Sequence, residues 1–505
     1  MSECNELQSN SLEKKILYLI AAGVFVFIFS YFSFANPIVP YDGDDWNYLG
    51  SYRAPVPIWG SWNPTRVLPE ILLPLTGYIA AYVVYPLIHD YLLSITIVTS
   101  LFIALTITGF FVLLTHTFKN ILDVKTYIAV GLSLIFLALH FILFLSKSDN
   151  NMYLLFTFNL TTIFYYLIPD FLNCSLILLF ITHQDFNTYF FNQLTDVKKC
   201  IFIIAAYFAI FSNVFCSEIL GVYCFTMLCI AAFSMFRNFS LKKNTLYLFI
   251  KNQKIYISIL LVWLISLFME AHGGRAHMVG PSKMDIGSAF QFFLSLTMLI
   301  NHRIAAIFLV IIIAMGIFLI KKDSALFKQT KLLTTLVYCF IAIFPMIIVS
   351  LLAAAKSVPF YAGIPNSMYG IFFLVLFSLL LCTGFLIKKY RVLSLLMPLG
   401  VIFILVFLMK GIPVMPSNTS HLTSNQCLTI DRAIIQQIVD ADKNGKDKID
   451  LKVPVWSGDN WPHSKDFVKS LPRTLYKHGI ISRPIQTTMV KDENFYKQYE
   501  INIKK

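Results

Sequence analysis

Residues 16–35 read ILYLIAAGVFVFIFSYFSFA, an uninterrupted apolar run that follows the basic pair Lys14 and Lys15. A run of this length is enough for an α-helix to cross the hydrocarbon core of a bilayer. It is too long for the core of a signal peptide, and no small-residue cleavage site follows it. We therefore interpret it as a retained membrane anchor.

Similar apolar runs recur along most of the chain. Hydrophobic residues make up 57% of the 505 residues and charged residues only 13%, which is too much apolar surface for a soluble protein to cover. We expect an all-α polytopic membrane protein with about eleven spanning helices. The predicted spans are residues 16–35, 92–117, 127–145, 160–181, 201–213, 219–236, 256–269, 304–320, 332–352, 368–387 and 392–409.

Basic residues gather in short clusters between these runs, and under the positive-inside rule the clusters predict the orientation. The N-terminus is then cytoplasmic, and residues 411–505 lie outside. The net charge of +13 is explained by topology, so we expect no nucleic-acid partner. Keeping the clusters on one side requires that residues 67–90 and 284–300 do not cross, so we interpret both as helices in the outer interface. The clusters lie around Lys14, Lys119, Lys198, Lys242, Lys321 and Lys388.

The first outer loop, residues 36–91, holds the strongest chemical signal. It contains YDGDDW at residues 41–46 and WGSWNPTR at residues 59–66. Asp42, Asp44 and Asp45 repel one another near a low dielectric, which raises the pKa of at least one carboxyl, as a general base requires. A solvated turn accounts for Asp-Gly equally well, but it accounts poorly for the tryptophans and for Arg66 downstream.

Two other outer turns carry candidate residues. Glu218 lies at the tip of a predicted helical hairpin, where a carboxylate is either functional or a contact between helices. In the loop EAHGGRAH at residues 270–277, Arg275 and His277 could hold a lipid phosphate beside an apolar groove, and the glycines let a ligand approach closely. Lys356 offers another cation. Alternatively, these are basic residues that touch lipid headgroups or snorkel.

The tail changes character after residue 410. Residues 431–440 are helix-like, 442–447 are rich in turn formers and 449–455 are strand-like. We predict a membrane domain at residues 1–410 and a small soluble α/β domain at residues 411–505. The nine cysteines lie mostly in apolar runs and form no disulfide framework, and no zinc motif, phosphate-binding loop or nucleophile elbow is present.

This layout resembles the GT-C superfamily of polytopic glycosyltransferases, in which an acidic pair in the first outer loop follows the first membrane helix. Asp44 and Asp45 stand in the place of that pair. Within the superfamily, the chain is most similar to the bacterial and phage serotype-converting O-antigen glucosyltransferases (Gtr type). The similar features are the aspartate-rich start of the loop, the Arg-containing stretch at residues 63–70 and a tail helix followed by the Val-Pro stretch at residues 449–454. Asp42-Gly43 departs from a plain acidic pair and leaves open which aspartate is the base.

The resemblance implies transfer of a hexose, with glucose expected, from undecaprenyl phosphate to a lipid-linked O-antigen (lipopolysaccharide) hydroxyl. The reaction would invert the anomeric centre at the periplasmic face of the bacterial inner membrane and cause serotype conversion by glucosylation. Asp44 or Asp45 would be the catalytic base. No metal or other cofactor is required, although an acidic pair could bind a divalent ion. The remaining assignments are donor-phosphate binding by Arg275, His277 and Lys356, and acceptor or sugar binding by Trp46, Trp62, Arg66 and Glu70.

A second interpretation is a flippase or transporter of lipid-linked sugars, or an O-antigen polymerase. A transporter should keep ionisable residues at mid-bilayer depth on discontinuous helices. The predicted spans are nearly free of charge, and the candidate charges gather at one face. This distribution favours the enzyme.

Overall fold

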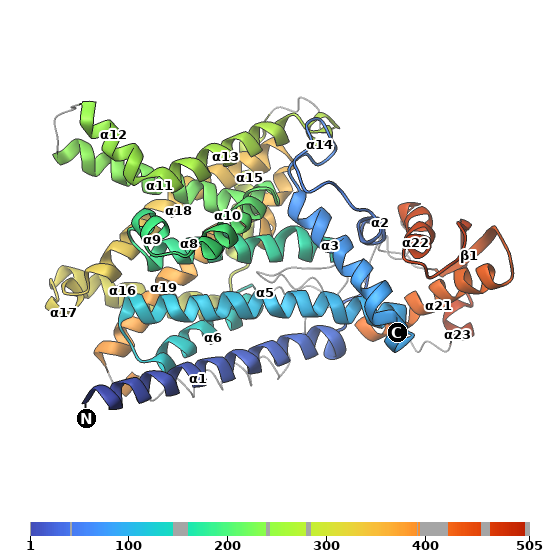
Figure 1. Ribbon diagram of the computed structural model, residues 1–505, viewed down its shortest axis with the longest axis horizontal. Coiled ribbons are helices and arrows are strands. Elements are labelled where there is room, and N and C mark those ends of the chain that lie inside the picture. The colour runs from blue at the N-terminus through green and yellow to red at the C-terminus, as the bar shows by residue number, and fades with distance from the viewer. Residues whose placement is uncertain are drawn as a thin grey trace.

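The computed structural model describes residues 2–40, 43–144, 160–238, 243–278, 284–390, 392–393, 423–455 and 465–499. Within these ranges, nine helices are long and apolar enough to cross a membrane, which confirms the prediction of a helical, multi-pass membrane protein. The longer helices form one bundle (Figure 1). They are α1 (Ser2–Ser30), α5 (Tyr91–Leu122), α6 (Thr126–Ile142), α8 (Ile168–Thr182), α10 (Asp196–Ile210), α11 (Val214–Asn238), α13 (Lys254–Ala271), α16 (His302–Ile320), α18 (Thr330–Lys356) and α19 (Tyr369–Lys389).

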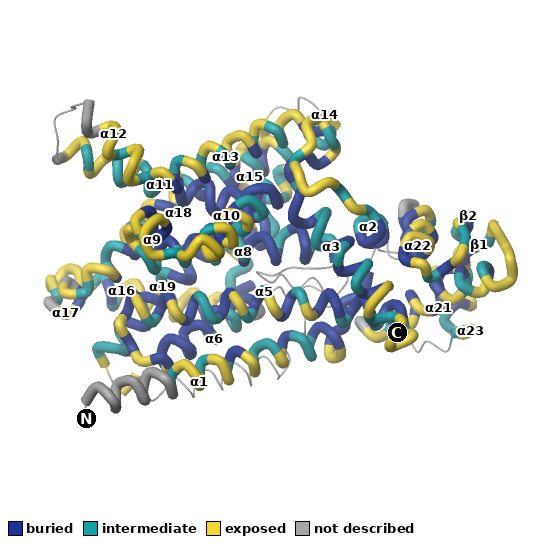
Figure 2. Tube along the Cα trace, in the orientation of Figure 1, coloured by how far each residue is buried: buried dark blue, intermediate teal, exposed yellow. Residues whose placement is uncertain are grey.

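The bundle is apolar on its outside as well as in its core. Helices α5, α8 and α19 bury most of their side chains, and the rings of Phe110 and Phe171 meet there at 4.6 Å. By contrast, only 11% of the α16 span is buried, although it is the most apolar of the nine. Figure 2 shows exposed residues along the outer helices. An apolar surface of this extent requires lipid as its solvent.

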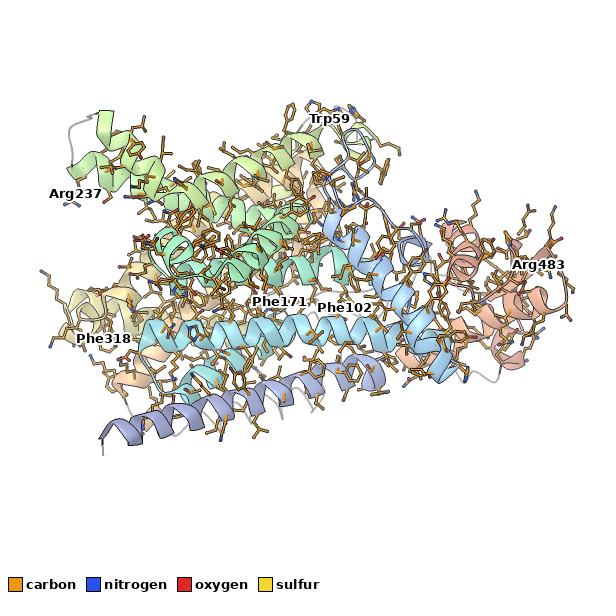
Figure 3. The ribbon with its side chains drawn as sticks, in the orientation of Figure 1. Trp59, Phe102, Phe171, Arg237, Phe318 and Arg483 are labelled. Carbon is orange, nitrogen blue, oxygen red and sulfur yellow. The ribbon has the colours of Figure 1, made fainter. Side chains whose placement is uncertain are left out.

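Ion pairs hold several helix ends together at one end of the bundle, which we call the basic end. Lys119 Nζ lies 2.6 Å from Glu13 Oε2, and Lys388 Nζ lies 3.3 Å from Asp123 Oδ2. Lys389 pairs with Asp323 beyond α16. Figure 3 shows Arg237 near the same end, whereas Arg483 lies at the opposite end. The predicted basic clusters around Lys119, Lys321 and Lys388 therefore share one end of the bundle.

The predicted number of spans stays a prediction. Predicted spans 127–145 and 201–213 fall on α6 and α10, which have 17 and 15 residues and are not among the nine candidate spans. Predicted span 392–409 lies outside the described residues except for its first two. The nine candidate helices also include Val67–Ile88, which the sequence had assigned to the interface.

The path of the chain supports that interfacial assignment. Thr96 Oγ1, near the start of α5, donates to the Ile38 carbonyl beyond α1 at 2.8 Å, so residues 39–90 leave and return to the same end. Between them, α3 (Val67–Ile79), η2 (Ala80–Val84) and α4 (Tyr85–Ile88) run obliquely across that end in Figure 1. Helix α15 (Ile286–Met298) likewise has both flanks at this end, because Asp285 N bonds Ala355 O and Asn301 N bonds Leu143 O.

Shorter elements connect the bundle helices, and several lie at the same end as α3. They are η1 (Tyr31–Ala35), α2 (Gly43–Leu49), α7 (Leu160–Thr162), η3 (Ile163–Leu167), α9 (Phe186–Asn192), α12 (Lys243–Asn252), α14 (Gly274–Met278), α17 (Ser324–Phe327), η4 (Pro359–Gly363) and η5 (Pro365–Met368).

The tail forms a small α/β unit that packs on this opposite end, which we call the domain end. It contains α21 (Ser424–Lys443), β1 (Lys448–Pro454), α22 (Lys465–Lys477), β2 (Gln486–Asp492) and α23 (Phe495–Gln498). The two strands are parallel, as strands joined by a helical crossover must be, and Leu451 lies opposite Met489. The Thr423 side chain and Gln426 form a capping box that starts α21. The helix and the strand predicted in the tail are both present.

Candidate functional site

The short helix α2 at the domain end carries both predicted catalytic aspartates, and it places them in different environments. The Asp44 side chain is exposed, whereas Asp45 is fully buried. Asp45 accepts hydrogen bonds from Leu160 N at 3.2 Å, Thr161 N at 2.7 Å and Thr161 Oγ1 at 2.6 Å. These bonds cap the first turn of α7. Asp45 is thus held in a structural contact, and Asp44 can meet a ligand. Asp42 lies outside the described residues.

The other end of α2 is fixed by α22 of the C-terminal unit. Thr474 Oγ1 donates to the Trp46 carbonyl at 2.5 Å, and Lys477 Nζ donates to the Gly50 carbonyl at 2.7 Å. These donors satisfy carbonyls that a helix leaves open at its C-terminus. Gly50 approaches Thr474 so closely that no Cβ would fit there. Trp46 is fully buried near Tyr91, so it anchors α2 and does not present its ring to solvent.

His478 links the C-terminal unit to both α2 and α5. Its Nδ1 lies 2.6 Å from Tyr91 Oη, and its Nε2 lies 3.2 Å from the Leu49 carbonyl. The carbonyl can only accept, so Nε2 carries the hydrogen and Nδ1 accepts from the tyrosine hydroxyl. Burial lowers the pKa of His478 from 6.5 to about 4. The neutral ring therefore joins three elements.

This pKa predicts that acid weakens the docking of the C-terminal unit. The pKa of His478 is lower in the folded protein than in the unfolded chain. Its contribution to the free energy of unfolding is therefore complete above pH 6.5 and is lost as the pH falls to about 4. The shift corresponds to a loss of about 3 kcal/mol in the free energy of unfolding. Thermal unfolding of the wild type and of His478→Gln across this range is the measurement. The wild type should lose more stability on acidification than the variant, and equal losses would contradict the assignment.

The comparison with the variant is needed because another buried group acts in the opposite direction. Burial, together with the nearby Asp45, raises the pKa of Asp431 on α21 well above its ordinary value. A carboxyl with a raised pKa favours the folded state at low pH, and that contribution is lost as the pH rises. Asp431 contributes equally in the wild type and in His478→Gln. The difference between the stability losses of the two proteins therefore reports the contribution of His478 alone.

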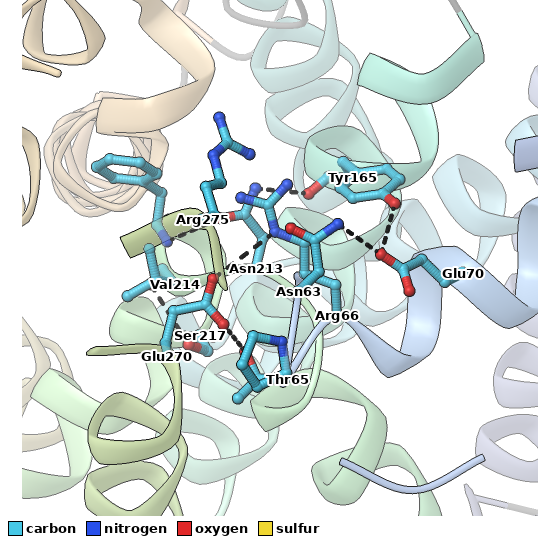
Figure 4. Close-up of polar contacts among 12 residues, drawn as sticks. Asn63, Thr65, Arg66, Glu70, Tyr165, Asn213, Val214, Ser217, Glu270 and Arg275 are labelled. Carbon is cyan, nitrogen blue, oxygen red and sulfur yellow. Dashed lines mark hydrogen bonds and ion pairs between the residues drawn. The ribbon is translucent and has the colours of Figure 1, made fainter. Parts of the chain in front are cut away.

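Beside α2, a layer of polar side chains surrounds Glu70 in the first turn of α3 (Figure 4). Arg53 Nη1 lies 2.9 Å from Glu70 Oε2. Asn63 Nδ2 and Tyr165 Oη donate to Glu70 Oε1 at 2.8 and 3.0 Å. Both oxygens of Glu70 are thus engaged. Through these contacts Glu70, a predicted sugar-binding residue, joins the outer loop, α3 and η3.

Arg66 lies next to this layer and has spare hydrogen-bonding capacity. Its Nε is 3.9 Å from Glu270 Oε1, and its guanidinium lies 5.2 Å from the centre of the Tyr165 ring. Thr65 Oγ1 donates to the other oxygen of Glu270 at 2.6 Å. The Arg66 side chain is 11% exposed, and its guanidinium donates no hydrogen bond within the described part of the chain. Its donors therefore remain for an anion.

The first turn of α14 joins the first outer loop. Gly274 N donates to Ser61 O at 2.8 Å, and Arg275 N donates to Trp62 O at 3.2 Å. Arg275 Nη2 also donates to Tyr361 Oη at 2.8 Å. The Trp62 side chain is exposed next to this junction. His277 and Lys356 are exposed as well, and no contact joins them to Arg275 in the described ranges.

Tyr48 connects Asp44 to the polar layer. Burial raises the pKa of Tyr48, and the charges of Glu70 and Asp44 add to this effect, which places both carboxylates within electrostatic range of its hydroxyl. Its ring packs against Tyr165, with centroids 5.3 Å apart. The structure therefore brings Asp44, Arg66, Glu70 and the neighbourhood of Arg275 to one end of the bundle.

Sequence reasoning missed several parts of this layer. Arg53 carried no signal beyond being a loop cation, and Tyr48 and Tyr165 have the interface preference of any tyrosine near a membrane. Their roles depend on contacts between segments that are far apart in the chain, such as Thr65 with Glu270.

Two carboxylates lie inside the bundle, below the polar layer. Glu218 on α11 is buried and accepts a hydrogen bond from Ser350 Oγ on α18. Asp170 on α8 is also fully buried. Glu218 thus makes a contact between helices, one of the two roles predicted for it. Asp170 lies within the predicted span 160–181, although the spans are expected to be nearly free of charge. In the described ranges, no three His, Cys, Asp or Glu side chains converge as metal ligands would, and the predicted independence of metal stays a prediction.

Comparisons with protein-family models, curated proteins and solved structures find no match for this chain. The fold defines a helical, multi-pass membrane protein.

Proposed function

We propose that the protein is a membrane glycosyltransferase that moves a hexose from a polyprenyl-phosphate carrier to a sugar hydroxyl. The observation that carries the proposal is the exposed carboxylate of Asp44 on a helix fixed at both ends, next to a layer in which Arg66 keeps unused donors. A rigid base and an anion site on one face are the two parts that such a displacement needs. The resemblance of residues 41–70 to GT-C enzymes supports the same reaction.

In this mechanism, Asp44 accepts the proton of the acceptor hydroxyl as its oxygen attacks the anomeric carbon. The bond between that carbon and the phosphate oxygen breaks, and the phosphate leaves with the bonding electrons. Arg66 and Arg275 stabilise the charge on the phosphate, because a guanidinium donates to phosphate oxygens in pairs. A single displacement inverts the anomeric centre. The proton on Asp44 then returns to water.

The other predicted site residues take supporting roles in the proposal. Trp62 is exposed beside Arg275 and offers a ring face to a sugar. Glu70 positions Arg53 and Tyr165, and its role in acceptor binding stays a prediction. His277 and Lys356 supply further positive charge for the donor phosphate. The assigned donor remains undecaprenyl-phosphate glucose, and the assigned acceptor remains a lipid-linked O-antigen sugar.

We propose that the domain end faces the periplasm of a bacterial inner membrane. The cations Lys119, Lys388 and Lys389 gather at the opposite end, which the positive-inside rule assigns to the cytoplasm. A reporter enzyme that is active only outside the cytoplasm, fused after Lys505, is therefore expected to be active. The same reporter fused after Lys322, at the basic end, is the matched control and should be inactive. The reverse pattern would overturn the orientation.

The direct test of the function is transfer by the purified full-length protein in lipid vesicles. The donor is polyprenyl-phosphate glucose with a labelled sugar, and the acceptor is a lipid-linked O-antigen saccharide. We expect the label to move to the acceptor with inversion. If the label stays on the carrier with every O-antigen acceptor and hexose supplied, the proposal is wrong.

One observation favours a transporter or flippase of lipid-linked sugars as the second candidate. Asp170 and Glu218 lie within the bundle, and intramembrane ionisable groups are typical of transport pathways. A flippase would move labelled polyprenyl-phosphate glucose between leaflets without an acceptor, whereas the proposed transferase would not. The same vesicles therefore separate the two functions.

A further inference from the structure

Helices α8 and α11 each bring one carboxylate to the interior of the bundle, where no basic residue of the described ranges pairs with it. Asp170 and Glu218 are buried and lie within electrostatic range of each other. Across the described ranges, neither residue forms an ion pair with Lys, Arg or His, although ten such pairs occur elsewhere. Buried charges are normally paired or bind a cation. This pair therefore lacks a compensating positive charge.

The oxygens of the pair are also underused as acceptors. Glu218 Oε1 accepts from Ser350 Oγ, whereas Glu218 Oε2 has no partner among the described residues. The Cys216 thiol lies within hydrogen-bonding reach of Asp170, but its one hydrogen points to the Tyr165 carbonyl at 3.5 Å, so both Asp170 oxygens lack a well-directed donor in the described ranges. Nearly all buried polar side-chain atoms in proteins have a partner. Three acceptor oxygens without a well-directed protein donor on two adjacent helices are available to a proton or a metal cation, because both satisfy carboxylate oxygens.

The groups around Asp170 cannot supply that charge. The thiols of Cys174 and Cys216 and the hydroxyl of Tyr369 lie within its electrostatic range, and a thiol is only a weak donor. The Tyr369 hydroxyl is 2.9 Å from His140 Nε2, while His140 Nδ1 is 2.8 Å from the Phe136 carbonyl. A neutral imidazole satisfies both contacts, with Nδ1 donating to the carbonyl and Nε2 accepting from the tyrosine. The hydroxyl hydrogen is then used in the bond to His140 and does not serve Asp170.

The carboxylate pair lies directly below the polar layer of the candidate site. Asn213 Nδ2, in the turn before α11, donates to the Tyr165 carbonyl at 3.2 Å, and the hydroxyl of the same tyrosine donates to Glu70. Asp170 follows Tyr165 by five residues, and Glu218 follows Asn213 by five. This separation corresponds to roughly 8 Å along a helix axis. The pair therefore lies about two helical turns from the polar layer at the domain end.

We propose that Asp170 and Glu218 form a buried binding site for a monovalent cation, either a proton or a sodium ion, that exchanges with water at the domain end. Binding a proton forms one O–H bond on a carboxylate and involves no oxidation or reduction. Binding sodium places the carboxylate oxygens and Ser350 Oγ around the ion. The two ions compete, because they neutralise the same pair.

Dicyclohexylcarbodiimide tests the proposal, because this apolar reagent reacts with protonated carboxyls in apolar surroundings. The full-length protein in vesicles is treated over a range of pH, and the modified residue is located by mass spectrometry. We expect modification at Asp170 or Glu218 that increases as the pH falls. Added sodium chloride suppresses it if the site accepts sodium, whereas choline chloride does not. Modification that is unaffected by either salt but depends on pH assigns the proton as the only ligand.

Variants and controls complete the test. Asp170→Asn and Glu218→Gln should each lose the modification at the altered position, and Asp196→Asn, at an exposed carboxylate near the basic end, should retain the wild-type pattern. Absence of modification at both buried residues in the wild type, or modification that depends on neither pH nor sodium, would overturn the proposal. The wild-type measurement does not depend on whether a variant folds. It uses no sugar substrate, so its outcome is independent of the proposed transferase activity.

Discussion

Asp44→Asn is expected to reduce sugar transfer by about a hundred- to ten-thousand-fold, which is the contribution of a positioned general base, and to leave the folded protein intact. The exposed Asp44 side chain can reach a substrate in the aqueous space at the domain end. Asparagine has nearly the same shape as aspartate but cannot take up the acceptor proton. The measurement is the initial rate of labelled glucose transfer in vesicles, together with the thermal unfolding temperature.

Asp45→Asn and Asp196→Asn are the two comparisons. Asp45 accepts two backbone N–H bonds and one hydroxyl bond through its two oxygens, and an amide can offer only one oxygen to these donors. We expect Asp45→Asn to destabilise the protein by about 1–3 kcal/mol, because it leaves a buried donor unsatisfied. Asp196 is an exposed carboxylate near the basic end, so its replacement should change neither the rate of sugar transfer nor the unfolding temperature. Full activity of Asp44→Asn would contradict the assignment of the base.

Much of the membrane architecture could be predicted, because a spanning helix is encoded locally. Hydrophobic runs of sufficient length located the helices, and basic clusters predicted that residues 67–90 and 284–300 begin and end on one side. The contact of Thr96 with Ile38 agrees with that path. What local patterns could not decide is whether a short helix such as α10 spans the bilayer, since its length alone is ambiguous.

The candidate site was predictable in outline but not in its detailed roles. The motif at residues 41–46 identified α2, yet nothing in Asp44-Asp45 distinguishes the two carboxylates. Their different environments arise from a contact with Thr161, more than a hundred residues away. The docking of α22 on α2 is equally non-local, and no sequence pattern indicates that Thr474 bonds the Trp46 carbonyl. Such contacts depend on tertiary packing and not on local pattern.

The buried pair of Arg53 and Glu70 predicts the second large effect. The two side chains are only 9% and 13% exposed. We expect Arg53→Met to destabilise the protein by about 3–5 kcal/mol, because it leaves a buried carboxylate without its counter-ion. Arg53→Lys should not restore stability. A lysine cannot reproduce the guanidinium bonds to the carbonyls of Asn63, at 2.7 Å, and Pro64, at 3.2 Å, in addition to the ion pair.

A double-mutant cycle separates this pair from simple loss of packing. Glu70→Gln removes the charge but keeps an oxygen for Asn63 and Tyr165, so Arg53→Met combined with Glu70→Gln should cost less than the sum of the single changes. The ion pair of Arg432 with Asp90 is the control, because its side chains are 43% and 29% exposed. Arg432→Met should cost no more than about 1 kcal/mol. If the Arg53 and Glu70 changes were additive, their ion pair would not stabilise the loop, and the polar layer beside α2 would be held by its neutral hydrogen bonds alone.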